Sequence, residues 1–326
     1  MTRRGWLLFL GLCIMWGIPY LLIKVALRDL DPGTLVFLRC ALTAAILLPW
    51  ASFTGRLSPL RGHLGWVAAF ALCECGVPWL LMSLAEQHLS SSLTALLIAA
   101  VPMLSAIIFR VSHPGEHLGA TRWIGLVLGT LGVGLLVGFS ATGSTGAALG
   151  MMAVVVLGYT VGPLIIAGRL AHLPGGGVVA ASVTLVAVIY APWGVTHLPT
   201  HLSAGSGWAV ATLAVVCTAM AFLTFFALVV EVGAPRATVV TYVNPAVAVL
   251  AGVILLSEAI TPAMLLGFPL VILGSVLATR RRSTQDEPGA VSAGRLREPS
   301  PPRSSPGEPR PARRHQASAP RTPDDT

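Results

Sequence analysis

The sequence at residues 79–94 reads WLLMSLAEQHLSSSLT and leads through an apolar segment to Pro102. A second stretch, LTFFALVVEVGAPRA at residues 223–237, leads in the same way to Asn244-Pro245. Pro102 and Pro245 lie 143 residues apart. Further pairs recur at nearly this offset: Pro19 with Pro163, Pro49-Trp50 with Pro192-Trp193, Cys73 with Cys217, Gly125 with Gly267, and Gly132 with Gly274. Recurrence at one offset indicates that the chain contains two copies of one structural unit.

The composition places both copies in a membrane. Of the 326 residues 55% are hydrophobic and 10% are charged, whereas charged residues make up about a quarter of a soluble domain. A helix needs about 20 mostly apolar residues to cross a bilayer. The sequence offers ten such runs, at residues 5–24, 32–50, 63–84, 91–110, 121–139, 147–168, 177–194, 208–230, 235–256 and 262–279. The predicted fold class is therefore an all-α integral membrane protein with ten transmembrane helices.

The distribution of Lys and Arg predicts the orientation, because these residues are retained on the cytoplasmic side. With the N-terminus inside, the outer side holds only Lys24 and Arg28. The inner side collects Arg3, Arg4, Arg56, Arg61, Arg110, Arg122, Arg169, Arg236 and Arg280. We therefore expect both termini inside a cytoplasmic membrane. The first copy (residues 1–140) and the second copy (residues 141–280) then have five spans each and opposite orientations, an architecture that recurs in secondary transporters.

Residues 281–326 differ in composition from the rest of the chain. They contain nine Arg, nine Pro and six acidic residues, with almost no large apolar side chain. Such a segment cannot form a core, so we expect a disordered cytoplasmic tail that can contact anionic membrane lipid. Because much of the positive charge is in this tail, the composition does not indicate nucleic-acid binding. The cysteines lie in apolar runs and are expected to be free thiols: Cys13, Cys40, Cys73, Cys75 and Cys217.

Several short motifs have the order and spacing of a known family. They are Met15-Trp16-Gly17, Phe37-Leu38-Arg39, the run Ala95 to Pro102, the run Ala237 to Pro245, LSEAIT at residues 256–261, and the last span from Gly267 to Gly274. Over residues 5–280 the chain resembles the EamA-type proteins of the drug/metabolite transporter superfamily. The resemblance implies ten helices in two inverted repeats and the movement of small metabolites, usually outward. The chain departs from the family's Leu-Gly-Glu after the fourth span, where it reads His113-Pro114-Gly115-Glu116.

Two charged residues are predicted to lie deep in the membrane. Glu74 is about 15 Å from the outer end of the third span, and Arg39 is about 10 Å from the same side in the second span. A charged group at such depth suggests function by default. One interpretation is a structural ion pair; the other is a carboxylate that binds a proton or substrate, with Arg39 as its electrostatic neighbour. The aligned positions of the second copy are Val183, for Arg39, and Thr218, for Glu74.

Other polar and aromatic residues complete the predicted binding site for a small-molecule substrate or a proton. In the first copy they are Trp16, Tyr20 and Trp79, next to the helix-interrupting Pro19 and Pro78. In the second copy they are Tyr159, Tyr242 and Asn244. Each also has a structural interpretation, because aromatic rings pack well and Asn244 can bond the carbonyls of its own helix. Glycines in the fifth span, Gly125, Gly129, Gly132, Gly134 and Gly138, let helices approach closely, so the fifth span and its repeat mate, the last span, are expected to be packing elements.

One motif favours an enzyme instead. His113, Glu116 and His117 match the inverted zinc-peptidase pattern, although Pro114-Gly115 would break the helix that this pattern needs. No nucleotide-binding fingerprint is present, so we expect no cofactor and an ion gradient as the energy source. The sequence therefore predicts a gradient-driven transporter with no catalytic or metal-binding residues, exporting small polar or amphipathic metabolites. Uptake and a metalloenzyme remain the alternatives, and the oligomeric state stays open.

Overall fold

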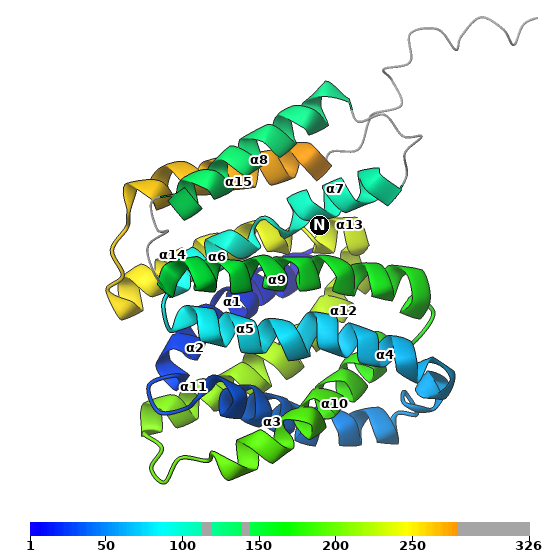
Figure 1. Ribbon diagram of the computed structural model, residues 1–326. Coiled ribbons are helices and arrows are strands. Elements are labelled where there is room, and N and C mark those ends of the chain that lie inside the picture. Colours follow the sequence, from blue (N-terminus) through cyan, green and yellow to red (C-terminus); the bar gives the residue numbers. More distant parts are fainter. Residues whose placement is uncertain (113–118, 139–143, 280–326) are drawn as a thin grey trace, which may run out of the picture. The chain divides into compact units, whose positions relative to one another are not determined.

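The computed structural model describes residues 1–112, 119–138 and 144–279, and every regular element in these ranges is helical (Figure 1). Nine helices there are long and apolar enough to cross a membrane. A further apolar helix, α14 (Val240–Leu256), has 17 residues. The all-helical prediction is confirmed for this part of the chain, and ten crossings remain a prediction. The predicted tail, residues 281–326, lies outside the described residues.

The first copy contains the elements up to α8. They are α1 (Arg3–Gly17), α2 (Pro19–Ala26), α3 (Pro32–Phe53), η1 (Ser58–His63), α4 (Leu64–Ala71), η2 (Leu72–Gly76), α5 (Val77–Glu86), α6 (Ser91–Ile98), α7 (Val101–Ser112) and α8 (Ala120–Gly138). The first predicted span is thus divided at Ile18, just before Pro19, whose nitrogen carries no hydrogen for a helical bond. The fourth is divided at Ala99 and Ala100, shortly before Pro102.

The second copy follows the same plan. Its elements are α9 (Ser144–Ile165), η3 (Ile166–Leu170), α10 (Gly175–Thr196), α11 (Ala204–Ala214), η4 (Val215–Met220), α12 (Ala221–Val232), α13 (Ala234–Ala237), α14 and α15 (Pro262–Thr279). The continuous helix predicted at residues 235–256 is wrong, because a turn at Thr238-Val239 separates α13 from α14. At this turn the amides of Thr241 and Tyr242 donate to carbonyls three residues back, which closes tighter turns than an α-helix has.

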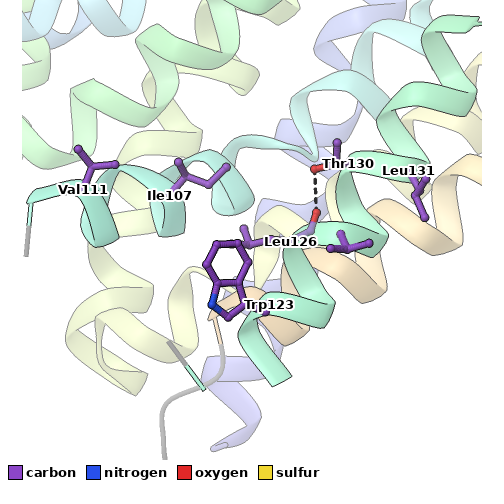
Figure 2. A pocket seen from close by; sticks show the side chains of 7 residues that line it. Ile107, Val111, Trp123, Leu126, Thr130 and Leu131 are labelled. Carbon is purple, nitrogen blue, oxygen red and sulfur yellow. Dashed lines mark hydrogen bonds between the residues drawn. The ribbon is translucent and has the colours of Figure 1, made fainter. Parts of the chain in front are cut away.

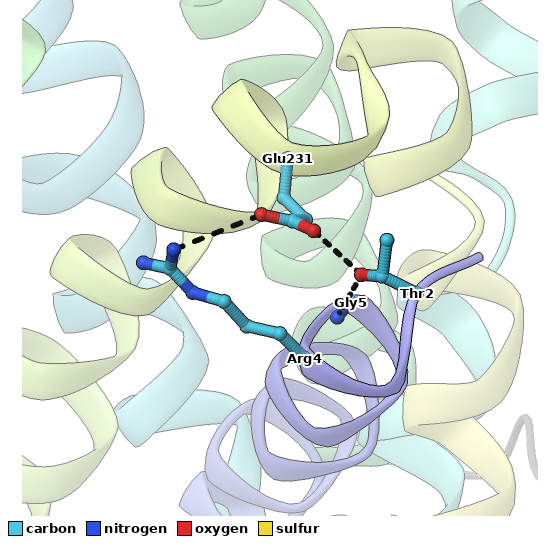
Figure 3. A network of polar contacts seen from close by, with 4 residues as sticks. All are labelled: Thr2, Arg4, Gly5 and Glu231. Carbon is cyan, nitrogen blue, oxygen red and sulfur yellow. Dashed lines mark hydrogen bonds and ion pairs between the residues drawn. The ribbon is translucent and has the colours of Figure 1, made fainter.

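Contacts between helix ends divide these ends into two groups, one at each end of the helix bundle. This division is expected when successive spans are antiparallel. At one end Trp193 donates to Asp31 (2.8 Å), and Ser203 donates to Asp29 through its amide (2.9 Å). At the other end the Thr2 hydroxyl donates to Glu231 (2.5 Å), which also pairs with Arg4 at 3.9 Å (Figure 3). We call the Asp31 end the predicted outer end, because the arginine distribution places it outside.

Equivalent spans of the two copies pack against each other. The helices α8 and α15 run side by side (Figure 1), and three glycines of α8 bring them together. A Cβ on Gly132 would lie 2.8 Å from the Gly267 carbonyl oxygen, and one on Gly125 would lie 2.7 Å from that of Gly274. Gly129 faces Met103 and Gly274. The predicted close approach is confirmed there, whereas Gly134 and Gly138 have no atom within 4 Å of the same position.

The helices α3 and α10 form the second such pair, again through glycines. Gly33 faces the indole of Trp193, and Gly176 faces that of Trp50. Further contacts cross between the copies, since α5 packs on α9 and α1 packs on α12 and α14. The described residues up to Thr279 form one compact unit with a shared core. Any site between the two copies is therefore bordered by helices from both.

Candidate functional site

The third span of each copy contains a π-helical segment at the same position. The segment η2 (Leu72–Gly76) lies between α4 and α5, and η4 (Val215–Met220) lies between α11 and α12. A π turn inserts an extra residue into a helix, and such insertions are frequent at functional sites. Glu74 and Thr218 occupy equivalent places in these segments. The sequence alignment of these two residues is thus matched by their backbone conformation.

Glu74 projects from η2 towards α9. A Cβ on Gly162 of α9 would overlap Oε2 of Glu74, so the absence of a side chain at Gly162 makes room for the carboxylate. One turn away, Gly158 makes similar room for the main-chain carbonyl of Cys73. A Cβ on Gly158 would also lie 2.9 Å from the ring of Pro78. Oε2 of Glu74 is buried and accepts no hydrogen bond from a described residue. Glu74 is half-buried, and its buried oxygen Oε2 lies at the contact between the two copies without a partner in the part of the chain that the structure describes.

Arg39 on α3 is held by two contacts. Its side chain is 6% exposed, and its Nε donates to the Thr218 hydroxyl at 3.0 Å. The guanidinium carbon lies 3.7 Å from the ring centre of Trp79, a cation–π contact. Arg39 and Glu74 form no ion pair, so of the two interpretations the structural ion pair finds no support. The reason is that α3 packs on η4 of the other copy, which supplies the hydrogen-bond partner instead.

Two tyrosines lie near these groups. Tyr159 on α9 interacts electrostatically with Tyr20, Glu74 and Arg39. Tyr20, the second residue of α2, is buried and interacts electrostatically with Arg39. We call the five residues Arg39, Glu74, Trp79, Tyr20 and Tyr159 the central polar group. The structure thus brings together five of the eight residues that the sequence proposed.

The other three predicted site residues have different surroundings. Trp16 packs against Phe222 and Phe225 of α12, with ring centres 5.8 and 5.2 Å away. Tyr242 shares a hydrogen bond of 2.7 Å with the Thr279 hydroxyl on α15. Asn244 lies on α14 next to Gly17 of α1, and its Oδ1 is buried without a partner among the described residues. None of the three has a contact with the central polar group among those found in the described residues.

Three charged residues near the predicted outer end were not proposed from the sequence. Glu86 ends α5 and is 0% exposed, with neither carboxylate oxygen hydrogen-bonded to a described residue. Lys24 of α2 donates to the main-chain carbonyls of Glu86 and, at 2.6 Å, Leu89. Glu258, after α14, accepts hydrogen bonds from Ser91 and Ser92 at the start of α6. In the sequence each of these residues is a charge at the end of an apolar run or directly beside one. A charge at such a place is usually interpreted as part of a solvated loop, so it does not indicate a site.

Two surface hollows lie away from the central polar group. One, of about 470 Å³, is lined by Ile107, Val111, Trp123, Leu126, Val127, Thr130 and Leu131 on α7 and α8 (Figure 2). The other, of about 410 Å³, is lined by Tyr242, Phe268, Pro269, Ile272, Leu273 and Val276 on α14 and α15. Both linings are almost entirely apolar. They lack the convergent polar groups that orient a substrate.

Metal-ligand chemistry finds no support in the described ranges. No group of three or more His, Cys, Asp and Glu side chains there is arranged to hold a metal ion. The five cysteines are free thiols, as predicted. His113, Glu116 and His117, on which the enzyme alternative depends, lie outside the described residues.

Comparison with known proteins identifies relatives over nearly the whole helical region. The "Uncharacterized inner membrane transporter YedA" of Escherichia coli K12 is 27% identical over 279 residues, covering 82% of this chain and 88% of the relative. The "Uncharacterized transporter YdfC" of Bacillus subtilis is 24% identical over 273 residues, covering 81% and 87%. A solved crystal structure matches with a TM-score of 0.62 at 20% identity, over 86% of this chain and 98% of that one, which supports the fold.

The sequence profile of the EamA-like transporter family matches the chain twice, at residues 3–138 and 145–280. The two matches cover both sets of helices described above. They agree with the two glycine-rich helix pairs and the two π-helical segments at equivalent positions. The chain therefore belongs to the EamA-like transporter family and is a multi-pass protein of the cell membrane.

Proposed function

We propose that this transporter is driven by the proton gradient and exports small polar or amphipathic metabolites, with Glu74 as the residue that binds the coupling proton. The observation that carries the proposal is the unpartnered carboxylate of Glu74, buried at Oε2 against Gly162. An ionised carboxylate away from water is costly unless it is paired, hydrated or protonated. Glu74 can meet this requirement by binding a proton when closed in and releasing it when water reaches it.

The position of Glu74 supports coupling to a conformational change. It lies on the first copy and faces α9 of the second. In transporters built from inverted repeats, one repeat or bundle moves against the other around a central site. Movement of α9 relative to α5 would change the access of water to this carboxylate. The same movement would alternate the exposure of the central polar group between the two sides.

The chemistry of the central polar group suggests a substrate class. Arg39 supplies a fixed positive charge, Glu74 a titratable acid, and Tyr20 and Tyr159 supply hydroxyl groups beside aromatic rings. This combination suits a compound with both polar and apolar parts, such as an amino-acid-like metabolite. The relatives YedA and YdfC are named as transporters without a substrate. Arg39 is proposed to orient an anionic group of the substrate.

The first experiment identifies a substrate and the direction of transport. Cells lacking the protein and cells overproducing it are compared for metabolites inside and in the medium. An exporter should lower an internal metabolite and raise it outside when overproduced. The opposite change would indicate uptake, which the sequence left open as the alternative.

The second experiment tests the role of Glu74 with that metabolite in proteoliposomes. The measured quantity is the rate of efflux at several imposed pH gradients. Glu74→Gln cannot release a proton and should lose the dependence of the rate on the gradient. Glu231→Gln is the matched control, because Glu231 is a carboxylate at a helix end that already has partners in Thr2 and Arg4 (Figure 3). An unchanged pH dependence in Glu74→Gln would disprove the proposed role.

A further inference from the structure

We infer that Glu86 is a second proton-binding site, and that the predicted outer end of the transporter closes only when this carboxyl holds a proton. The inference deepens the proposed function and rests on it. It assigns to the outer end a proton site separate from Glu74, twelve residues further along the same span.

The burial of Glu86 is the first observation. Its side chain is 0% exposed, and neither Oε1 nor Oε2 receives a hydrogen bond from a described residue. Leaving a buried polar group unsatisfied costs about 1–3 kcal/mol, and more when the group is charged. The closed arrangement therefore favours the neutral, protonated carboxyl over the carboxylate.

The second observation is that the charged groups near Glu86 make their hydrogen bonds elsewhere. Lys24, the nearby cation, directs its ammonium to the main-chain carbonyls of Glu86 and Leu89, and no ion pair joins it to the Glu86 side chain. Glu258 is fully engaged with α6: it accepts from the amides of Ser91 (2.8 Å) and Ser92 (3.0 Å) and from both hydroxyls (2.8 and 2.5 Å). No donor in this arrangement is directed at an ionised Glu86.

Glu258 itself is held as a carboxylate. Burial acts to raise the pKa of Glu258, but the hydrogen bonds from Ser92 and Ser91 prevail and keep this pKa below its ordinary value. Gly252 makes room for the contact, since a Cβ there would lie 2.5 Å from Oε2 of Glu258. The site at the start of α6 therefore carries one fixed negative charge, which lies within electrostatic range of Glu86.

Two charged groups act on the Glu86 carboxyl, Lys24 and Glu258, and together with Glu86 they balance only when Glu86 is neutral. Lys24 contributes one positive charge and Glu258 one negative charge, so an ionised Glu86 would leave one uncompensated negative charge without exposure to water. The elements packed against α5 add the following titratable groups: Tyr20 and Lys24 on α2, Arg39 and Cys40 on α3, Cys73, Glu74 and Cys75 on η2, and Tyr159 on α9. Helix α6 adds none. Arg39 is already committed to Thr218 and Trp79.

A simple proton cycle follows from this arrangement. When the outer end opens, water reaches Glu86, and the carboxyl transfers its proton to water and becomes a carboxylate. The adjacent ammonium of Lys24 stabilises the ionised form. When the outer end closes, the carboxylate takes a proton back from the external water. Closing on the outer side thus consumes one external proton, in addition to any proton that Glu74 carries.

The test measures outer opening rather than transport. In a variant with the native cysteines replaced, Leu93→Cys places a thiol in the first turn of α6, where the side chain is 7% exposed. Its rate of labelling by a membrane-impermeant maleimide is measured over a series of external pH values. Leu202→Cys, at an exposed position before α11, gives the reference rate that corrects for the pH dependence of the thiol reaction.

The expected result is a corrected labelling rate that rises by up to about tenfold per pH unit, because closing binds one proton. Glu86→Gln, which resembles the protonated form, should label slowly at every pH, and Glu86→Asp should keep the pH dependence. Glu74→Gln should also keep it while losing gradient-driven efflux, which separates this inference from the proposed function. A pH dependence in Glu86→Gln equal to that of the parent would overturn the inference.

Infrared spectroscopy gives a second readout that does not depend on labelling. The closed parent protein should show a carbonyl stretching band of a neutral carboxyl that Glu86→Gln lacks. If Glu86→Gln does not insert into the membrane, Glu86→Asp remains available and should shift the frequency of that band. An unchanged band in the folded variants would contradict protonation of Glu86.

Discussion

The segments η2 and η4 share one backbone conformation but differ in how their polar side chains are satisfied. In η4 the Thr218 hydroxyl donates to the Leu213 carbonyl at 2.7 Å and accepts from Arg39 at 3.0 Å. In η2 Glu74 has a larger, charged side chain and a buried oxygen without a partner in the described residues. The uncharged Thr218 of η4 thus has two hydrogen-bond partners, whereas the buried oxygen of Glu74 in η2 has none among the described residues. The polar side chain of this segment is therefore satisfied in one copy, whereas in the other a buried oxygen is left without a described partner.

The second span of the other copy packs against each segment, and it offers a hydrogen-bond donor in one case only. Arg39 on α3 reaches η4, and the position aligned with Arg39 on the second copy is Val183 of α10, the helix packed against η2. Val183 is buried and carries no polar atom on its side chain. Glu74 therefore lacks the donor that its counterpart Thr218 has. The following predictions change one side of this comparison at a time.

The largest effect is expected from filling the space beside Glu74. Gly162→Leu should abolish gradient-driven efflux, because the new side chain would displace the carboxylate from its place against α9. Overpacking of this kind costs about 1–3 kcal/mol of stability. Efflux from proteoliposomes and thermal melting in detergent measure the two effects. Gly150→Leu on the same helix is the control, since no atom lies within 4 Å of a Cβ there and both readings should stay near the parent values.

Removing Arg39 should mainly affect stability. Arg39→Met deletes the hydrogen bond to Thr218 and the contact over Trp79. Hydrogen bonds to charged groups contribute about 1.5–3 kcal/mol, so the variant should melt earlier. Efflux should weaken through poorer substrate orientation, but its dependence on the pH gradient should persist because Glu74 is intact. If Arg39→Met lost the pH dependence as Glu74→Gln is expected to, the two copies would be coupled more directly than their contacts indicate.

Glu258 provides a carboxylate whose partners are complete. Its pKa is lowered in the folded protein, so its contribution to stability is present above the unfolded value, near 4.5, and is lost as the pH falls through the folded value. Glu258→Gln should therefore lower stability at neutral pH by about 0.5–2 kcal/mol, the usual range for loss of a helix cap. Melting curves of parent and variant should converge on acidification. A constant difference down to the most acidic pH would contradict the cap.

The smallest effects are expected from substitutions at Thr218, the partner of Arg39, and at Val183, the position equivalent to Arg39. Thr218→Val should cost about 0.5–1.5 kcal/mol through the lost hydrogen bonds and leave the pH dependence of efflux unchanged. Val183→Thr is nearly equal in volume and offers Glu74 a hydroxyl donor, which favours the charged form. The pH midpoint of efflux should then move to lower pH. No shift would mean that the side chain at position 183 does not reach the carboxylate.

Much of this fold could be predicted from local features of the sequence. Apolar runs of about 20 residues predict the spans, and Pro19 and Pro102 mark two of the interruptions. The turn at Thr238-Val239 could not be predicted in this way. The helix breakers before it, Gly233 and Pro235, lie at the end of α12 and within α13, and Pro245 lies inside α14, so no breaker marks the turn itself.

Two residues of the candidate site could be identified from the sequence, but their contacts could not. Glu74 and Arg39 were recognised because a charge within an apolar run is conspicuous. Their contacts were not, because the two copies interlock and Arg39 bonds a residue 179 positions away. Glu86 was missed since it lies just beyond the apolar run and reads as a loop residue. Its burial depends on α2 and on Glu258, whose proximity no local pattern reveals.

Arg39 contacts Thr218 of the other copy, whereas the position equivalent to Arg39 is the apolar Val183, and this asymmetry has an evolutionary consequence. In a dimer of two identical five-span subunits every residue occurs twice, so an Arg at the first position and a Glu at the second would meet at both symmetric places. Each carboxylate would then have a guanidinium neighbour, and neither would be free to exchange a proton without it. Gene duplication followed by fusion removes this constraint. Once the two copies are encoded separately, substitutions can remove the acid from one site while the other keeps it.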